Sequence, residues 1–245
     1  MARAELKPGR VLLLIGIMVA SVFLWDYAVL LPFKLLAVMG HETGHALASL
    51  VVGGSVDRVS LRPDESGQCL SRIPQGFFAK TLVYSAGYVG SAMLSVVLLV
   101  LTYRFNARRK MLALACVWLA VMGVIYARDA FTLAFCAGMA VLFGLGAKWL
   151  PASVVGGLNL FLASFTALYS IMDLKDDLWN GAVRAQSDAQ LLANLTVVPA
   201  VVWALLWTVM SLLILAFGAR VAMTERTPGV GGTPAPLPVR AGELG

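Results

Sequence analysis

The sequence has few charged residues. Asp, Glu, Lys and Arg make up only 13% of its 245 residues, whereas 60% are hydrophobic and the mean hydropathy is +0.84. Soluble domains contain roughly a quarter charged and about half apolar residues. Several apolar runs reach the ~20 residues that cross the hydrocarbon core of a bilayer. The scarcity of charge excludes an ordinary soluble protein and predicts an integral membrane protein.

Cysteine is also scarce. The three cysteines, Cys69, Cys116 and Cys136, show no Cys-x-x-Cys spacing. Two of them lie in apolar runs, where a thiol usually behaves as a small hydrophobic group. The sequence therefore predicts neither a disulfide framework nor a cysteine-rich zinc site.

The net charge of +6 does not indicate a nucleic-acid partner. The basic residues fall in short clusters between apolar runs, whereas a nucleic-acid interface needs them along one face. Such clusters are typical of loops at a lipid surface. We expect the lipid bilayer as a partner and no nucleic acid.

Seven hydrophobic segments are separated by polar, glycine-containing or proline-containing breaks. They cover about residues 11–31, 33–52, 80–103, 111–127, 129–147, 152–179 and 196–219. This pattern predicts an all-α polytopic membrane protein with about six to seven transmembrane helices. We expect one transmembrane domain over residues 1–223. Residues 224–245 are rich in Gly and Pro, with few large apolar residues, and predict a flexible tail.

A more polar stretch follows the second segment, at residues 55–73. Val56, Val59 and Leu61 are interspersed with polar residues, and residues 63–67 (Pro-Asp-Glu-Ser-Gly) have the composition of a turn. Apolar residues in near alternation around a turn favour a β-hairpin. We predict two short antiparallel strands close to the helix that precedes them.

Both histidines of the chain belong to one short motif, His41-Glu42-Thr43-Gly44-His45. At ~100° per residue, side chains four positions apart share one face of a helix, so both imidazoles can reach one zinc ion. In zinc hydrolases with this arrangement, the glutamate is the general base that takes a proton from water. Ionisable residues inside an apolar segment are functional candidates because their insertion costs free energy.

A catalytic zinc ion needs a third protein ligand and an open position for water. With no other histidine, the candidates are carboxylates or cysteines within the apolar segments. Asp173 is the best candidate because an unbroken apolar run precedes it and further apolar residues follow. Asp26, Asp176 and Asp177 remain alternatives. Asp188 is set aside because it lies outside the hydrophobic segments.

At these residues the chain resembles the site-2 protease family of intramembrane zinc metallopeptidases, and within it the compact bacterial B-like branch. The resemblance covers about residues 38–215. It rests on residues 41–50 followed by Gly53-Gly54, the hairpin with Ser66-Gly67, the Ser85-Ala86-Gly87-Tyr88 opening of the next segment, and the Asp173 region with Ser187-Asp188-Ala189.

The resemblance implies that His41, His45 and Asp173 bind Zn²⁺ and that Glu42 is the catalytic base. It further implies that the hairpin helps to present a membrane-protein substrate with a transmembrane segment. The expected location is the inner or plasma membrane of a bacterial cell, crossed several times. One departure concerns Asp173, which is followed by Leu174 instead of the Asp-Gly pair in the Asn-Pro-x-x-Asp-Gly motif of better-studied members.

A second hypothesis is a non-catalytic membrane protein that binds metal or acts as a scaffold. It would keep the histidines and cleave nothing. Glu42 favours the enzyme, because a site that only binds metal needs no base at that position.

Overall fold

The computed structural model describes residues 4–6, 8–179 and 187–226. Most of this chain is helical. The helices are α1 (Pro8–Phe23), α2 (Leu31–Val51), α3 (Phe77–Tyr103), α4 (Arg108–Val121), α5 (Ala130–Trp149), α6 (Ala152–Trp179), α8 (Asp188–Leu195) and α9 (Ala200–Met223). Two short helical turns accompany them, a 3-10 helix at Ala28–Leu30 and a π-helix at Met122–Tyr126. The strands are β1 (Ala4–Leu6), β2 (Ser55–Leu61), β3 (Gly67–Arg72) and β4 (Thr224–Arg226).

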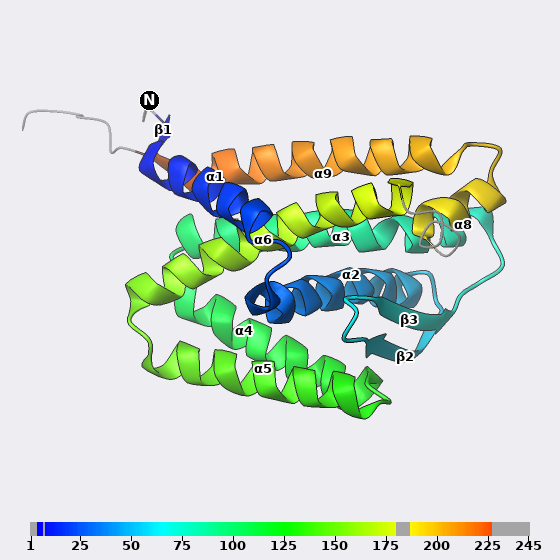
Figure 1. Ribbon diagram of the computed structural model, residues 1–245, viewed down its shortest axis with the longest axis horizontal. Helices are drawn as coiled ribbons and strands as arrows, with labels where there is room; N and C mark the ends of the chain where they lie inside the picture. The colour runs from blue at the N-terminus through cyan, green and yellow to red at the C-terminus, as the bar shows by residue number, and fades with distance from the viewer. Residues whose placement is uncertain (1–3, 7, 180–186, 227–245) are drawn as a thin grey trace, which may run out of the picture.

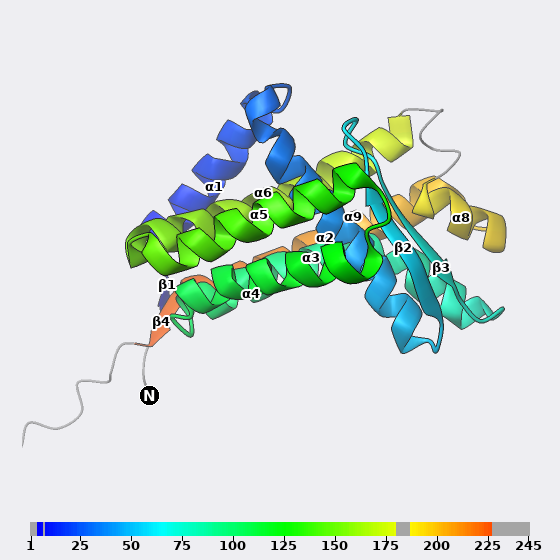
Figure 2. The same ribbon diagram turned by 90° about the horizontal axis from the view of Figure 1, so that it is seen from below.

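Five helices of the described chain are long and apolar enough to cross a membrane. They are α3, α4 continued by its π-helical turn, α5, α6 and α9. Helix α1 is shorter, with 16 residues, and Figure 2 shows it meeting α2 in a V. The architecture confirms the predicted all-α polytopic membrane fold with one small β-hairpin after the motif helix.

The long helices run side by side along the long axis of the molecule, as Figure 1 shows. Of these five helices, α6 is the most enclosed. In its most apolar stretch of 18 residues, 72% of the residues are buried, against 22% for α9. One core cluster joins α2, α4, α5 and α6 through fully buried side chains. Its members include Met39, Leu112, Phe143, Val155 and Phe165. Helix α6 therefore packs in the interior of the helix group and supports α2, which carries the histidine motif.

The hairpin forms as the sequence predicts, with β2 and β3 antiparallel and the turn between Leu61 and Gly67. Its two outer edges differ. Along β2, Val59 forms a bridge with Ala127, and the main-chain N–H of Leu61 donates a 2.8 Å hydrogen bond to Thr132 Oγ1. Within the described chain, β3 has no second strand beside it. One edge of the hairpin is thus covered by the helices, and the other remains available for pairing.

The first and last described elements also pair, because β1 and β4 form a two-stranded antiparallel sheet. Figure 2 shows this pair where α1 begins and α9 ends. The predicted flexible tail lies outside the described residues from 227 onward. The described part of that range, Thr224–Arg226, is strand β4.

Candidate metal centre

Helix α2 carries the histidine motif. It has Pro32 in its first turn, a position where proline fits because no intrahelical N–H bond is lost there. After the helix, Gly53 adopts a positive φ of 80°, as glycine commonly does at a helix C-terminus. Within the motif, Trp118 Nε1 donates a 3.1 Å hydrogen bond to the hydroxyl of Thr43, which donates to the carbonyl of Met39. These contacts fix the helix that presents the histidines.

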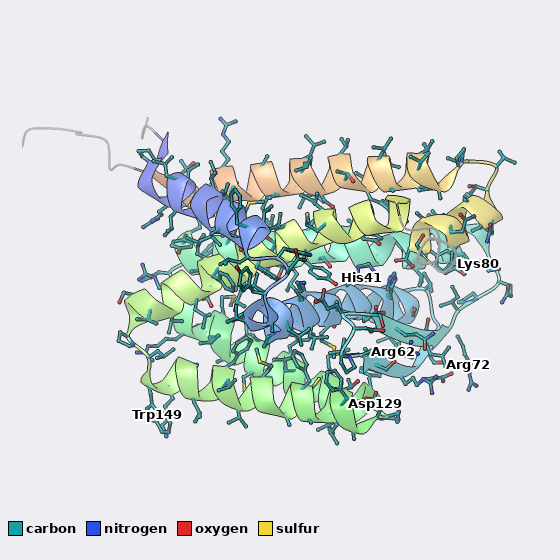
Figure 3. All side chains as sticks on the ribbon, viewed as in Figure 1. His41, Arg62, Arg72, Lys80, Asp129 and Trp149 are labelled. Atoms are coloured by element: carbon teal, nitrogen blue, oxygen red, sulfur yellow. The ribbon has the colours of Figure 1, made fainter. Side chains whose placement is uncertain are left out.

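Two glycines bring α3 against the motif. A Cβ on Gly44 would collide with the carbonyl oxygen of Ala86, and a Cβ on Gly87 would collide with the imidazole of His41. The helices α2 and α3 therefore approach closely only because these positions have no side chain. The His41 ring lies over Gly87 and meets Tyr88 edge to face, with ring centres 4.6 Å apart. Figure 3 labels His41 between α3 and α2, toward the end of these helices at which the hairpin lies.

A hydrogen bond orients the His45 ring. Its Nδ1–H donates to the carbonyl of Val83 on α3 at 2.7 Å. This bond leaves Nε2 as the nitrogen that faces the site, where it lies 3.0 Å from His41 Nε2. An imidazole whose far nitrogen donates to a carbonyl is the usual arrangement for a metal ligand. The i and i+4 geometry predicted from the sequence is confirmed.

The carboxylate beside the histidines is Asp188. Its Oδ2 lies 3.2 Å from His41 Nε2 and 3.0 Å from His45 Nε2. The residue sits in the first turn of α8, where the Ser187 side chain caps the helix by accepting from the N–H of Gln190. The short helix is docked by Ala189 and Leu192, which are buried in one cluster with Tyr88, Ala204 and Trp207.

The three donor atoms fit a zinc ion. Ligand atoms at ~2.1 Å from a tetrahedral zinc lie about 3.4 Å apart, and here the three separations are 3.0, 3.0 and 3.2 Å. Because His45 Nδ1 carries the proton, a neutral His45 points a lone pair at a carboxylate, which is repulsive unless a cation lies between them. Within the described residues, His41, His45 and Asp188 form the group able to hold a metal.

The sequence analysis set Asp188 aside, whereas the structure places its carboxylate against both histidines. Asp188 lies outside the hydrophobic segments, but it is the first residue of the short helix α8, which delivers it to the site. Burial alone would raise the pKa of the Asp188 carboxyl, but positive charge at the histidine site, whether on protonated imidazoles or on a bound cation, brings that pKa well below its ordinary value. The carboxyl is therefore ionised, as a metal ligand must be.

The sequence contains a signal for this position. Ser187, Asp188 and Gln190 form a helix start, with a capping serine followed by an acid in the first turn. The other candidates differ in status. Asp26 is exposed in the bend after α1 and is not part of the group. The side chains of Asp173, Asp176 and Asp177 lie outside the described residues, although their backbone belongs to α6.

Glu42 lies beside the histidines and is buried, with 6% of its surface exposed. The hairpin backbone covers it, because a Cβ on Gly67 would come within 2.6 Å of Glu42 Oε1. Helix and hairpin meet again at Ser49 Oγ, which donates to Ser71 Oγ at 2.9 Å. Strand β3 is thus fixed along the face of α2 that bears the catalytic candidate.

A cavity of about 620 Å³ opens over these residues. Its walls include His41, Glu42 and His45 on one side and β3 residues 67–71 on the other. Cys69 faces this space, and burial, followed by the negative charges of Glu42 and Asp188, raises the pKa of its thiol to about 12. The cysteine is therefore a neutral wall residue, and the cavity joins the histidine site to the open edge of β3.

A model of the Peptidase M50B-like family matches residues 14–218 of the chain. The chain belongs to this family. The matched range includes the motif helix, the hairpin and Asp188, and it confirms the resemblance to the site-2 proteases. Membership of a peptidase family, together with the apolar helices, identifies a multi-pass integral membrane protein of a hydrolase family. No curated protein and no solved structure matches the chain.

Proposed function

We propose that the chain is an intramembrane zinc metallopeptidase that hydrolyses peptide bonds of membrane-embedded protein substrates, with His41, His45 and Asp188 as zinc ligands and Glu42 as catalytic base. The observation that carries the proposal is the convergence of two imidazole nitrogens and one carboxylate oxygen within 3.2 Å of one another beside a buried glutamate. Following the bacterial branch that it resembles, we expect the protein in the inner or plasma membrane of a bacterial cell.

Bound zinc supplies a Lewis acid that polarises the scissile carbonyl and lowers the pKa of water to about 7. Glu42 takes the proton of the attacking water and passes it to the leaving amine, which is the general acid–base role of this residue in the motif. His45 is held by Val83 in the tautomer that a ligand needs. Gly67 packs against the Glu42 side chain and limits the positions that its carboxylate can take.

The hairpin supports a mode of substrate binding. A peptide bond inside a transmembrane helix is hydrogen-bonded and hidden, so the substrate has to unwind locally before cleavage. An extended substrate segment can add to the free edge of a hairpin strand, so the two strand edges have to be compared. The outer edge of β2 is occupied by Ala127 and Thr132, whereas β3 faces the cavity. We therefore assign β3 as the strand to which an extended substrate adds.

Non-catalytic metal binding is the competing function. A site that only stores or senses metal does not need an acid one residue after the first ligand. The placement of Glu42 in the same cavity as both histidines favours catalysis.

The test separates binding of the ion from its use. Zinc content and cleavage would be measured for purified wild-type protein, Glu42→Gln and His45→Ala, with a model substrate whose transmembrane segment is interrupted by Gly and Pro. Glu42→Gln should keep its zinc while cleavage falls by ~10² to 10⁴-fold, the loss expected without a general base. His45→Ala should lose both, since two protein ligands seldom hold zinc tightly. Full cleavage by Glu42→Gln would refute the peptidase mechanism.

A further inference from the structure

Lys34 is a buried cation in an apolar helix, and the reaction does not use it. Only 5% of its surface is exposed. Its Nζ lies 2.8 Å from Glu65 Oε1 and 4.8 Å from the ring centre of Trp25. A buried charge is costly unless it is paired, so an ion in such a place indicates a function for the pair. The partner here belongs to the tip of the hairpin.

Glu65 is held in an unusual conformation at that tip. Its φ is 69°, in the left-handed region that residues other than glycine seldom adopt. Its carbonyl oxygen accepts a 3.3 Å hydrogen bond from the hydroxyl of Tyr169 on α6. Such a conformation costs free energy and persists when the surroundings impose it. Lys34 and Tyr169 supply those surroundings from two different helices.

The tip lies close to the catalytic glutamate along the hairpin. Lys34, Val38 and Glu42 are spaced four residues apart, so they follow one face of α2. Glu65 contacts the first of them, and Gly67, two residues later, packs against the other two. Two residues of backbone therefore link the ion pair to the point where β3 covers Glu42. A shift of the tip would therefore move the backbone that packs against Glu42.

We propose that Lys34 and Glu65 are positioning residues: their ion pair clasps the hairpin tip to α2, which sets both the carboxylate of Glu42 and the edge of β3 for the substrate. The clasp rests on the proposed peptidase function for its effect on cleavage. Its effect on the hairpin does not require that function, and this difference allows the two proposals to be tested separately.

The first measurement reports how accessible strand β3 is and does not depend on peptidase activity. Alkylation of Cys69 on β3 would be quantified by mass spectrometry, with Cys136, which is fully buried in α5, as the internal reference. Lys34→Gln should raise the labelling rate of Cys69 by about tenfold, since a released strand opens locally. Lys34→Arg, which keeps the cation, should remain near the wild-type rate.

The matched control is a second ion pair on the same hairpin. Arg72 Nε lies 3.0 Å from Asp57 Oδ2, but the Arg72 side chain is 81% exposed. An exposed pair contributes little, so Asp57→Asn should leave Cys69 labelling unchanged. Equal labelling rates in wild type, Lys34→Gln and Glu65→Gln would overturn the clasp.

The second measurement is cleavage of the same model substrate, expressed per bound zinc. Lys34→Gln should retain zinc and lose about 10 to 100-fold in kcat/KM, through both lower kcat and higher KM, because base and strand edge move together. Glu65→Gln should show a smaller loss in kcat/KM. This variant replaces Lys34→Gln in the test if Lys34→Gln does not fold. Unchanged kcat and KM per zinc would overturn the positioning role. Absence of cleavage by the wild type would count against the peptidase proposal and leave the labelling test of the clasp intact.

Discussion

The seam between α2 and α3 and the outer helix α5 both contain glycines in apolar surroundings, but these glycines have different consequences. At the seam, a Cβ on Gly44 or Gly87 would strike the neighbouring helix or the His41 ring. In α5, a Cβ on Gly138 would meet no other atom within 4 Å, and neighbouring side chains such as Leu142 are exposed. Glycine at positions 44 and 87 therefore allows a close contact between helices at the site, whereas Gly138 does not contribute to a helix contact.

The contrast extends to polar groups. Helix α2 carries buried polar groups at the seam and under the hairpin, including His45, Glu42 and Ser49, whereas α5 is an apolar helix with exposed leucines and valines. The layer that holds the candidate metal centre therefore combines close backbone contacts with buried polar groups. Substitutions of equal size should have unequal effects in the two regions, and four of them test this expectation.

The largest effect is expected at the carboxylate. Asp188→Asn removes a charged ligand, so zinc affinity should fall by more than ~10²-fold, beyond the 10 to 100-fold cost of losing a group that only orients a ligand. Asp173→Asn, in α6, is the matched variant and should keep its zinc. Metal content after dialysis against a weak chelator gives the measurement. The reverse result would return the third ligand to Asp173.

Next comes Gly87→Ala. The new methyl group occupies the place of the His41 imidazole, so the ring has to move and zinc affinity should fall by about 10 to 100-fold. Gly138→Ala adds the same methyl group where space is open and should leave zinc binding unchanged, with stability equal or higher because alanine favours helices. Similar zinc affinities for the two variants would remove the distinction between seam and outer helix.

Gly67→Ala should affect catalysis more than metal binding. Its methyl group would press on Glu42 and Val38, displacing the base while the ligands stay in place. We expect retained zinc and a fall in kcat of about 10²-fold, the scale of a small misplacement of a catalytic group. Gly76→Ala, in open space before α3, is the control and should cleave as wild type does. Zinc loss in Gly67→Ala would show that the hairpin also shapes the ligand set.

The smallest effect is expected at the base of the hairpin. Ser71→Ala deletes the partner of Ser49, which is fully buried, so unfolding free energy should fall by about 1 kcal/mol. The double variant Ser49→Ala with Ser71→Ala removes both groups and should recover part of that loss. Denaturant unfolding in detergent micelles would measure both, and a double variant less stable than the single would contradict the hydrogen bond as the cause.

Local patterns explain what could be predicted from the sequence. Helix positions follow from apolar runs, and the faces of His41 and His45 follow from helical spacing. The hairpin follows from its interspersed polar residues and its turn composition. Each of these depends on residues close together in the chain.

The approach of Asp188 to the histidines and the Lys34–Glu65 ion pair could not be predicted because they depend on long-range contacts. Asp188 is 147 residues from His41, and its approach depends on how α8 docks through Leu192 onto α3 and α9. Glu65 appeared as an ordinary turn residue, and only the packed structure pairs it with Lys34. Sequence spacing identifies which side chains can share a helix face, but not which loop returns to that face.

The pairing of β1 with β4 has a consequence for the membrane topology as a whole. Because Ala4–Leu6 and Thr224–Arg226 lie in one sheet, the chain between them crosses the bilayer an even number of times. Five helices are long and apolar enough to span, so an even number requires a further crossing, for which α1 with 16 residues and α2 with 21 are the candidates. Reporter proteins fused before β1 and after β4 would consequently share one compartment.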